Sequence, residues 1–465
     1  MYTLKKGTAL STKVIKDAIE WNEEQKKMYI QADDYYKGDH QITEREKPKG
    51  LKNNKIVINH PKYITKINVG YFLGNPVEYV LQGKDAKNKK YQTILDEILE
   101  AYKKQTIKDL DKKLAKDDSK YGVAYEYIFA NSESEPVSSV INPKNCILVR
   151  DDSMDHAKMF AIVYEAVKRK SKDDEDAKYI GVWTVDDRER LTYDEDLNKV
   201  GSADHAIGEV PVVEYLNNDD RIGDYYDVIS LVDAYNLLCS DRVNDKEALV
   251  DSLLILYGVD LTDDQIRKSR EQRTISVPPK TKGTEVTYVT KELNEEQLEI
   301  LKKSIVDDIH KISMTPNMTD ENFVGNSSGV AIRFKLLPFE LNVQDKETAF
   351  ERGLMERMSL YNKYLNKTDQ TQLLPIYNVD AVFKRSLPQN DYETSQMILN
   401  LMGKVSDESL ISQLSFVQDA SAELEKRRQE IIKYIQGDNP NYGENKPNEG
   451  EDEEIEESPE ENPEE

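Results

Sequence analysis

One stretch decides the fold, residues 208–256, which read GEVPVVEYLNNDDRIGDYYDVISLVDAYNLLCSDRVNDKEALVDSLLIL. An apolar strand, Val210–Tyr215, runs into the polar turn Asn217–Asp220, and a long helix follows. One side of the helix is apolar or aromatic, at Val228, Leu231, Val232, Tyr235 and Leu238. Its middle, Ser240–Glu247, is strongly polar, and its end, Ala248–Leu256, is apolar again. Such a helix does not fit one ordinary core, so we expect its polar centre to face water, a partner or a channel.

Length and composition set the broad class of the protein. The chain has 465 residues, enough for two to four domains. Its longest apolar stretch, Leu253–Val259, is far shorter than the roughly 18 residues that cross a bilayer. Residues 1–14 show no secretion signal, and we expect no membrane partner. Cys146 and Cys239 are isolated, which favours free thiols in a reducing compartment.

The charge of the chain is strongly negative, at −24. The tail Asp438–Glu465 holds thirteen acids against Lys446 alone, so it accounts for −12 and the rest of the chain for the other −12. Gripping a phosphate backbone requires lysine and arginine in excess. The composition therefore disfavours a DNA-gripping surface but allows one along which DNA slides.

Helical and strand patterns alternate before residue 216. A first helix is predicted from Ser11 or Thr12 to Tyr36, with Gly38 as its stop signal. A second helix is predicted to start after Asn59–Pro61, and a third to run over Tyr91–Leu114. Strands are predicted at Val77–Leu81, Val123–Phe129, Cys146–Val149, Met159–Val167, Tyr179–Val185, Arg190–Tyr193 and Val210–Tyr215. Helices and sheets within one chain indicate a mostly helical α+β fold.

After residue 256 a small insertion separates two long helices. Short strands are predicted at Thr274–Val277 and Glu285–Val289, and Asn294 with Gln297 resembles a capping box for a helix over Glu295–Met314. We therefore expect an antiparallel helix pair that projects a compact knob.

The last third begins with the polar loop Thr315–Ser328. A very long helix, Gly329–Asn366, contains Pro338, which predicts a kink near Leu337. A strand over Tyr377–Lys384 and two or three helices over Asp391–Gln436 follow. The remaining acidic, Pro- and Gly-rich residues are predicted to be disordered.

Signatures of catalysis are absent from the sequence. There is no P-loop, GxSxG or HExxH motif, and the five histidines show no metal-ligand spacing, so each is expected to be a surface or core residue. Eight pairs of adjacent aspartates occur, but neighbouring side chains diverge, so we interpret all eight as solvated surface. The best metal candidate is the loop Asp151–His156, including Asp152 and Asp155, and even this is weak. We expect no catalytic residue, metal or cofactor.

Two further motifs have ordinary explanations. The tyrosines Tyr71, Tyr79, Tyr121, Tyr125 and Tyr127 could stack on bases, but burial is the commoner role for this residue. The segment 325–329, GNSSG, resembles a phosphate loop without its lysine and is better interpreted as a flexible loop with a helix cap.

Several blocks resemble the portal proteins of tailed bacteriophages, in the siphovirus portal family. They are Tyr35–Gly38, Asn54–Val77 (NKIVINHPKYITKINVGYFLGNPV), Tyr121–Phe129 (YGVAYEYIF), Pro211–Asn236 with its NNDDRIGDYYDVISLVDAYN, and Ser328–Phe339 (SGVAIRFKLLPF). Their order and spacing carry the resemblance, which extends over roughly Tyr29–Gln436.

The resemblance implies the portal architecture of wing, stem, clip and crown. Residues 1–220 would form the wing, 221–256 the stem helix, 257–293 the clip and 294–314 the second stem helix. Residues 315–328 would form a tunnel loop, 329–388 the long kinked helix with a wing strand, 389–436 the crown and 437–465 a disordered acidic tail.

The resemblance also implies a set of sites. Tunnel-loop residues facing DNA would be Asn317, Thr319, Asp320, Glu321, Asn322, Phe323, Val324 and Asn326. Basic residues that could line the channel are Lys302, Lys303 and Lys311, and Pro338 would kink the long helix.

The function implied is a dodecameric ring at one capsid vertex, through which DNA is packaged and ejected. Its partners would be copies of itself, double-stranded DNA, the terminase large subunit, scaffolding and major capsid proteins, and head–tail connector or adaptor proteins. The protein would reside in the virion after assembly in the host bacterial cytoplasm. The alternatives are a metal-dependent nuclease or other nucleic-acid enzyme of a mobile element, and a different virion adaptor protein.

Overall fold

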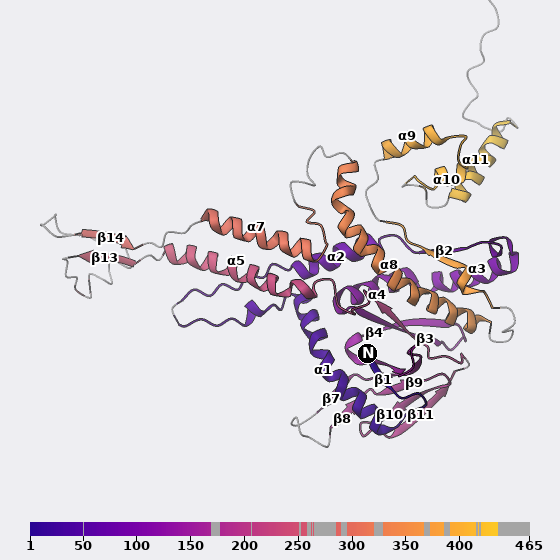
Figure 1. The fold of residues 1–465 in the computed structure, drawn as a ribbon, viewed down its shortest axis with the longest axis horizontal. Coiled ribbons are helices and arrows are strands. Elements are labelled where there is room, and N and C mark those ends of the chain that lie inside the picture. Colours follow the sequence, from indigo (N-terminus) through magenta and orange to yellow (C-terminus); the bar gives the residue numbers. More distant parts are fainter. Residues whose placement is uncertain are drawn as a thin grey trace, which may run out of the picture. The chain divides into compact units, whose positions relative to one another are not determined.

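The computed structural model describes residues 1–49, 51–168, 177–205, 207–250, 253–257, 262, 264, 285–289, 295–319, 329–366, 373–385, 391–414, 417 and 420–435. The chain divides into two compact units, Met1–Ser386 and Leu387–Glu465. Helices and sheets both contribute to the first unit, which confirms the mixed α+β class (Figure 1). No helix in the described part of the chain combines the length and apolarity that crossing a membrane would require.

Helix α1 (Thr12–Lys37) begins and ends where the sequence predicts. Ser11 caps its start by accepting a hydrogen bond from the Val14 N–H at 3.4 Å. Gly38 ends it in the left-handed conformation, with φ of 104°, and donates its N–H to the Asp34 carbonyl. The apolar face, which includes Ile15 and Ile19, packs against the larger sheet.

Helix α2 (His60–Phe72) starts at the predicted Asn59–Pro61 signal. Asn59 Oδ1 accepts the Lys62 N–H at 2.9 Å, and Pro61 occupies the first turn, where its missing N–H costs nothing. The chain then forms β2 (Glu78–Leu81), which pairs antiparallel with β15 (Val379–Val382). Both strands were predicted, and β15 is shorter than the expected Tyr377–Lys384.

The single helix predicted over Tyr91–Leu114 is wrong. Two helices occupy this region, α3 (Lys89–Lys104) and α4 (Ile107–Tyr121). The break lies at Gln105 and Thr106, and Thr106 has a φ of 51°. Gln105 Oε1 accepts hydrogen bonds from the Ser138 N–H and the Tyr361 hydroxyl, both at 3.0 Å. The chain turns there because the apolar stripes of both helices face one core, which a straight helix could not supply.

Two sheets form the β-rich region. The larger has the order β1 (Tyr2–Leu4), β5 (Cys146–Asp151), β6 (Lys158–Val163), β9 (Trp183–Val185), β10 (Glu189–Tyr193) and β11 (Lys199–Asp204). The smaller has the order β12 (Val212–Leu216), β3 (Val123–Ala130) and β4 (Pro136–Ile141). A separate pair is β7 (Ala166–Lys168) with β8 (Lys178–Ile180).

The predicted strands Met159–Val167 and Tyr179–Val185 are each divided in two. Gly181, with a φ of 64°, breaks the second, and the chain at Tyr164 leaves the sheet to donate its N–H to the Asn145 carbonyl. The sequence analysis missed β1, β4 and β11. Strands β4 (PVSSVI) and β11 (KVGSAD) are edge strands with too little alternating apolar character to be recognised.

Helix α8 (Gly329–Leu365) covers the smaller sheet and contains Pro338, as predicted. Gly353 allows the close approach, because a Cβ built there would lie 2.5 Å from a ring carbon of Tyr215 on β12. Figure 1 shows α8 changing direction along its length. The assignment of that bend to Pro338 stays a prediction.

A charged cluster is sealed beneath α8. The Arg357 side chain is 0% exposed, its Nε donates to both oxygens of Glu126 at 3.0 and 2.8 Å, and its Nη1 donates to Asp111 at 2.6 Å. The Tyr215 hydroxyl donates to Glu126 at 2.6 Å. Burial disfavours each charge, so the cluster depends on the opposite charges and on the hydrogen bonds between them, although Arg357 Nη2 is buried without a partner among the described residues. It joins α8 to α4, β3 and β12.

The described residues of the second unit form three helices, the upper number predicted for Asp391–Gln436. They are α9 (Asp391–Leu401), α10 (Asp407–Ile411) and α11 (Ala420–Ile435). Ser406 caps α10 by accepting the Ser409 N–H at 3.3 Å. The predicted disordered tail lies outside the described residues.

Candidate channel-forming hairpin

Within the described residues, two helices and two strands form the hairpin predicted between residues 221 and 314. Helix α5 (Ile229–Val250) and helix α7 (Glu295–Ile312) lie side by side, and β13 (Leu253–Tyr257) pairs antiparallel with β14 (Glu285–Val289) beyond them (Figure 1). Strand β14 matches its prediction. The helical prediction for Ala248–Leu256 is wrong at its end, because the LLILY segment is a strand, whose apolar and aromatic residues suit a ladder. The predicted strand Thr274–Val277 lies outside the described residues.

Ion pairs hold the far ends of α5 and α7 together. Arg242 lies 2.7 Å from Glu295 and also pairs with Glu299, while Lys246 lies 3.1 Å from Glu295. These side chains are exposed to solvent, which screens them, so each pair contributes only modestly to stability. They fix the alignment of the two helices more than they stabilise them.

Part of the polar centre of α5 contacts the same chain instead of facing water, a partner or a channel, whereas Lys246 and Glu247 are exposed, as expected. Asn236, Ser240 and Asn244 are buried and form one line along the helix. Their side-chain oxygens accept the backbone N–H groups of Ile58, Ile56 and Asn54 at 2.9, 3.0 and 2.8 Å. We call this set the polar ladder.

The spacing of the polar ladder has a geometric reason. Four residues of an α-helix rise about 6 Å, and two residues of an extended chain span about 6.6 Å. Every fourth residue of α5 therefore meets every second amide of residues 54–58, with the two segments antiparallel. Four residues also turn a helix by about 400°, so the line drifts by about 40° per step and suits only a few contacts.

Charged contacts extend the same interface. Arg45 and Lys47 lie 2.6 and 2.9 Å from Asp241, and Asn54 Nδ2 donates to Glu247 at 3.0 Å. Sequence reasoning missed this role, although the Asn, Ser, Asn spacing at positions i, i+4 and i+8 was visible. The missing information was the partner, an extended segment without any strand pattern of its own.

Three of the five histidines meet at the base of the hairpin. The ring centroids of His60 and His310 are 5.7 Å apart, and His60 is 5.2 Å from Tyr235. Asn236 Nδ2 donates to His40 Nδ1 at 2.8 Å, and His40 Nε2 donates to the Tyr35 carbonyl at 2.9 Å. Burial, followed by the neighbouring His310 and His40, lowers the pKa of His60 to about 4. Burial also lowers the pKa of His40 and His310, so the cluster is neutral at pH 7.

The start of the predicted tunnel loop is tied to α2. The Tyr63 hydroxyl donates to the Pro316 carbonyl at 3.0 Å and accepts the Met318 N–H at 2.9 Å. Thr315 is held twice, because its hydroxyl accepts from Asn68 Nδ2 and its carbonyl accepts from His310 Nδ1, both at 2.9 Å. The segment at 315–318 therefore leaves α7 in a fixed direction. Sequence reasoning did not single out Tyr63 or Asn68.

Two of the predicted tunnel-loop residues lie in the described part. Asn317 Oδ1 accepts the N–H and hydroxyl of Thr319 at 3.2 and 2.7 Å, which forms a local turn. The other six, Asp320, Glu321, Asn322, Phe323, Val324 and Asn326, lie outside the described residues, as does most of the GNSSG segment.

The predicted basic residues all lie on α7. Lys302 is partly buried, 3.8 Å from Glu299, whereas Lys303 and Lys311 are exposed. Which of them faces a channel depends on neighbouring copies, so their role stays a prediction.

The loop Asp151–His156 uses its acids for internal hydrogen bonds. Asp151 accepts the N–H groups of Ser153 and Ala157 at 3.3 and 2.9 Å, and Asp155 accepts the Ser153 hydroxyl at 2.6 Å. Asp152 accepts the Lys6 N–H at 3.0 Å. Among the residues that the structure describes, no three His, Cys, Asp or Glu side chains gather as metal ligands.

The adjacent aspartates are not all solvated, which corrects the sequence interpretation. Asp33, Asp118 and Asp151 are buried. Asp33 is surrounded by Lys37, Lys120 and Lys144 at 2.6–2.8 Å. Burial alone would raise the pKa of Asp33, but the lysine hydrogen bonds outweigh it and lower that pKa.

Four of the five tyrosines considered for base stacking are buried, at positions 71, 121, 125 and 127, which confirms the interpretation as core residues. Cys146 is buried and Cys239 partly buried, and both are free thiols.

Comparisons with known proteins identify the family. The family model "Phage portal protein, SPP1 Gp6-like" matches residues 15–437. The portal protein of Bacillus phage SPP1 is 23% identical over 409 residues, which cover 83% of this chain and 77% of that protein. The portal protein of Clostridium phage phiCD119 is 25% identical over 223 residues, covering 46% of this chain and 47% of that protein.

One solved structure that the chain resembles is part of a neck assembly. The neck of an empty GTA particle, computed with C6 symmetry, aligns with a TM-score of 0.43 and 14% identity over 75% of this chain and 88% of that one. The family model covers most of the chain, and the family is structural rather than catalytic. The chain therefore belongs to the SPP1 Gp6-like family of phage portal proteins.

Proposed function

We propose that the chain forms a closed ring at one vertex of a phage capsid, with twelve copies arranged around a central channel. The α5–α7 hairpin of each copy is the stem that lines the channel, and β13 and β14 belong to the clip at its end. The body made by residues 1–220 and α8 is the wing, and α9–α11 form the crown. Double-stranded DNA passes along the axis during packaging and ejection.

One observation supports the ring most directly: the hairpin leaves large apolar side chains exposed in a single copy. Ile300 and Leu301 on α7 are 64% and 49% exposed, and Leu237 on α5 is 44% exposed. Polar contacts to α2 and residues 54–58 already fix the hairpin. A rigid element with apolar sides is suited to packing between neighbouring copies, and head-to-tail contacts that close give rings.

The channel is proposed to carry few strong DNA contacts. The chain is strongly acidic, and the predicted basic positions Lys302, Lys303 and Lys311 are few. Acidic rings repel phosphates, while scattered lysines give weak, repeated contacts, which suits DNA that must slide. The tunnel loop, 315–328, would reach the DNA from the anchored base at Thr315 and Pro316.

The other partners follow from the place in the particle. The clip would meet the terminase large subunit during packaging and head–tail connector proteins afterwards, and the wing would face scaffolding and major capsid proteins. The ring would be assembled in the host bacterial cytoplasm and retained in the virion.

Electron microscopy of the purified protein tests the ring. We expect class averages of closed rings with a central channel wide enough for a DNA duplex, roughly 20 Å or more. The variant I300D should reduce ring formation, because it places a charge in an apolar contact. The matched control is V200D on β11, where Val200 is also 64% exposed but lies outside the hairpin.

The outcomes are distinct. Rings lost in I300D and retained in V200D support packing through the hairpin. Monomers or dimers of the unmodified protein at high concentration would refute the ring. Equal ring formation by both variants would refute the role of α7 in the contact, but not the ring itself.

A further inference from the structure

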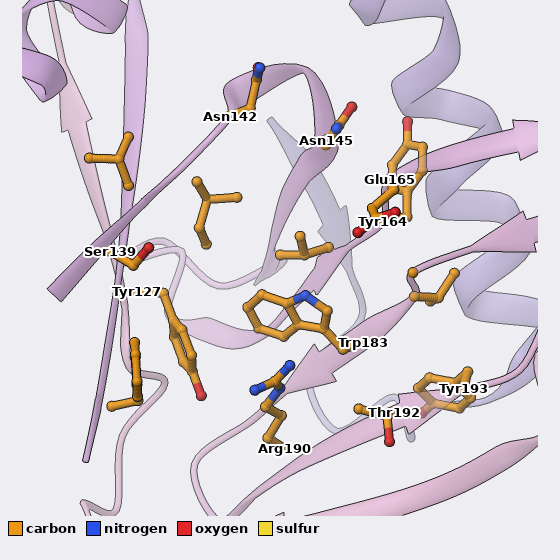
Figure 2. Close-up of a pocket in the computed structure, with 16 residues that line it drawn as sticks. Tyr127, Ser139, Asn142, Asn145, Tyr164, Glu165, Trp183, Arg190, Thr192 and Tyr193 are labelled. Atoms are coloured by element: carbon orange, nitrogen blue, oxygen red, sulfur yellow. The ribbon is translucent and has the colours of Figure 1, made fainter. Parts of the chain in front are cut away.

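A cavity of about 600 Å³ opens between the two sheets of the first unit (Figure 2). Its walls come from the β3–β4 hairpin on one side and from β6, β9 and β10 on the other. The volume is within the range of roughly 300–1,000 Å³ that is common for binding sites. The cavity is remote in sequence from the hairpin and has no part in the proposed channel.

Arg190 lies over an aromatic wall of the cavity. Its guanidinium carbon is 4.6 Å from the centroid of the Trp183 ring and 5.9 Å from that of Tyr127. Tyr127 stacks on Phe129 and lies 4.9 Å from Trp183. Figure 2 shows Trp183 and Arg190 together in the centre of the cavity, with Tyr127 beside them. The aromatic faces hold the guanidinium in place through cation–π contacts.

The guanidinium of Arg190 lacks an anionic partner within the described residues. Its Nε is buried without a hydrogen-bond partner there, and no described carboxylate lies within 4 Å. Arg221, Arg357 and Arg385, by contrast, each pair with at least one carboxylate at 2.6–2.8 Å. The Nε atom itself is closed to solvent, so an external acceptor would meet the guanidinium at its terminal nitrogens, where a charged donor without an anionic partner favours binding.

The chemistry of the cavity selects a carboxylate. Arginine presents a planar fork that matches a carboxylate or a phosphate. The wall also contains the exposed carboxylate of Glu165, and the chain carries a net charge of −24, both of which disfavour a polyanion such as DNA. A single carboxylate beside an apolar group fits Arg190 and the aromatic wall together.

The edge strand β4 indicates that this carboxylate belongs to an extended peptide. Strand β4 is the outer strand of its sheet, and Ser139, Val140 and Ile141 line the cavity. The free backbone groups of an edge strand can pair with an added strand. Gln105 already binds the Ser138 N–H and the Pro136 carbonyl, so an added strand would pair beyond them, next to Val140. The amide side chains of Asn142 and Asn145 lie on the same wall and can hydrogen-bond to a peptide backbone.

We propose that this cavity binds an acidic peptide segment of another protein, with a Glu or Asp side chain on Arg190 and an adjacent apolar side chain against Trp183 and Tyr127. The proposal does not depend on ring formation. A protein that uses this site would dock on the side of the first unit that holds the β-rich region, away from α5 and α7.

A library of displayed random heptapeptides tests the proposal. Peptides are selected for binding to the full-length protein, and those that also bind R190Q are removed by counter-selection. We expect the selected peptides to share an acidic residue next to an apolar one. Arg188 offers a matched control, because it precedes Arg190 by two residues and its side chain is 86% exposed. R188Q should bind the selected peptides as the unmodified protein does.

Fluorescence gives the affinity, because Trp21 and Trp183 are the two tryptophans of the chain. Trp21 packs against Tyr2 and does not line the cavity, so W21F leaves Trp183 as the reporter. In the W21F background, a selected peptide should change the Trp183 emission saturably. R190Q, or a peptide with Gln in place of its acid, should weaken binding about tenfold or more. R190K, which keeps the charge but not the fork, should fall between.

Several results would overturn the proposal. They are the absence of any heptapeptide that prefers the unmodified protein to R190Q, selected peptides without an acid, or equal binding of the acid and Gln peptides. An Arg190-dependent change of Trp183 emission with a random-sequence DNA duplex would assign the cavity to phosphate instead. If R190Q does not fold, S139F replaces it, since a large side chain on exposed Ser139 blocks the cavity without altering Arg190 or adding a tryptophan. Unchanged binding to S139F would refute the site.

Discussion

Removal of one oxygen from the polar ladder should loosen the segment at 54–58 without changing the core. In S240A, the Ile56 N–H loses the only acceptor that the described residues give it, the Ser240 hydroxyl at 3.0 Å. Ile56 is partly exposed, so water can replace part of the lost hydrogen bond. We expect the free energy of opening this amide to fall by about 1 kcal/mol, which raises its hydrogen-exchange rate roughly fivefold.

The N236A variant should have a larger effect. Asn236 is fully buried and serves two partners, because its Oδ1 accepts the Ile58 N–H and its Nδ2 donates to His40 Nδ1. In N236A both partners are left without a hydrogen bond, which should lower the free energy of opening this segment by about 3 kcal/mol. The hydrogen-exchange rate of the Ile58 amide should then rise on the order of 100-fold. The ordering of the two variants is therefore a quantitative consequence of the ladder.

Hydrogen exchange measured by mass spectrometry on peptides that cover residues 52–60 provides the assay. The control is S230A, which makes the same chemical change on the exposed side of α5, and its exchange should match that of the unmodified protein. Peptides from α3 should not change in any variant. Unchanged exchange at residues 54–58 in both S240A and N236A would show that the ladder does not hold this segment, and our explanation of the polar centre of α5 would be wrong.

Three further predictions concern other parts of the chain. R357M should lower the free energy of unfolding, measured by urea titration, by about 3–5 kcal/mol, because Glu126 and Asp111 lose their buried counter-charge. R352M, on the exposed side of α8, should change it by less than about 1 kcal/mol, and equal effects of the two variants would contradict the role of the cluster. Folding lowers the pKa of His60 from 6.5 to about 4, so its contribution to stability should be fully present above pH 6.5 and be lost as the pH falls toward 4. Thermal unfolding measured from pH 7 to 4 should therefore show a smaller decrease in H60Q than in the unmodified protein. An identical dependence of the melting temperature on pH would exclude His60 as the source of the decrease. Deletion of residues 317–326 should leave rings intact by electron microscopy and block DNA packaging, and normal packaging would refute the assignment of the tunnel loop.

Local signals in the sequence were sufficient to predict many of the helices and strands and where they begin or end. Ser11 and Gly38 set the ends of α1, and Asn59 with Pro61 set the start of α2, because caps depend on one or two residues and the adjacent backbone. The alternating residues of EVTYV predicted β14 for a similar reason. The break between α3 and α4 could not be predicted, because no Gly or Pro marks it and a distant hydrogen-bond partner, Ser138, fixes it.

The functional residues show the same limit. The hairpin and the place of Pro338 followed from sequence, whereas the target of the polar centre of α5 did not, because the amides it binds lie about 180 residues earlier in the chain. Arg190 also carried no sequence signal. Its importance comes from the aromatic rings beside it and from the acceptor it lacks in the described structure, and both are properties of the fold alone.

The polar ladder also makes the two sides of one interface unequal in the substitutions they accept. Helix α5 contributes side chains, so a change at Asn236, Ser240 or Asn244 removes a contact directly. The opposite segment contributes mainly its backbone N–H groups at Asn54, Ile56 and Ile58, which every residue except proline supplies. Its one side-chain hydrogen-bond donor to α5 in the described structure is Asn54 Nδ2, which donates to Asn244 and Glu247 at 3.0 Å. Relatives are therefore expected to tolerate changes of side chain at Ile56 more readily than at Ser240 opposite it, provided that the length of the segment and the absence of proline at three alternate positions are retained.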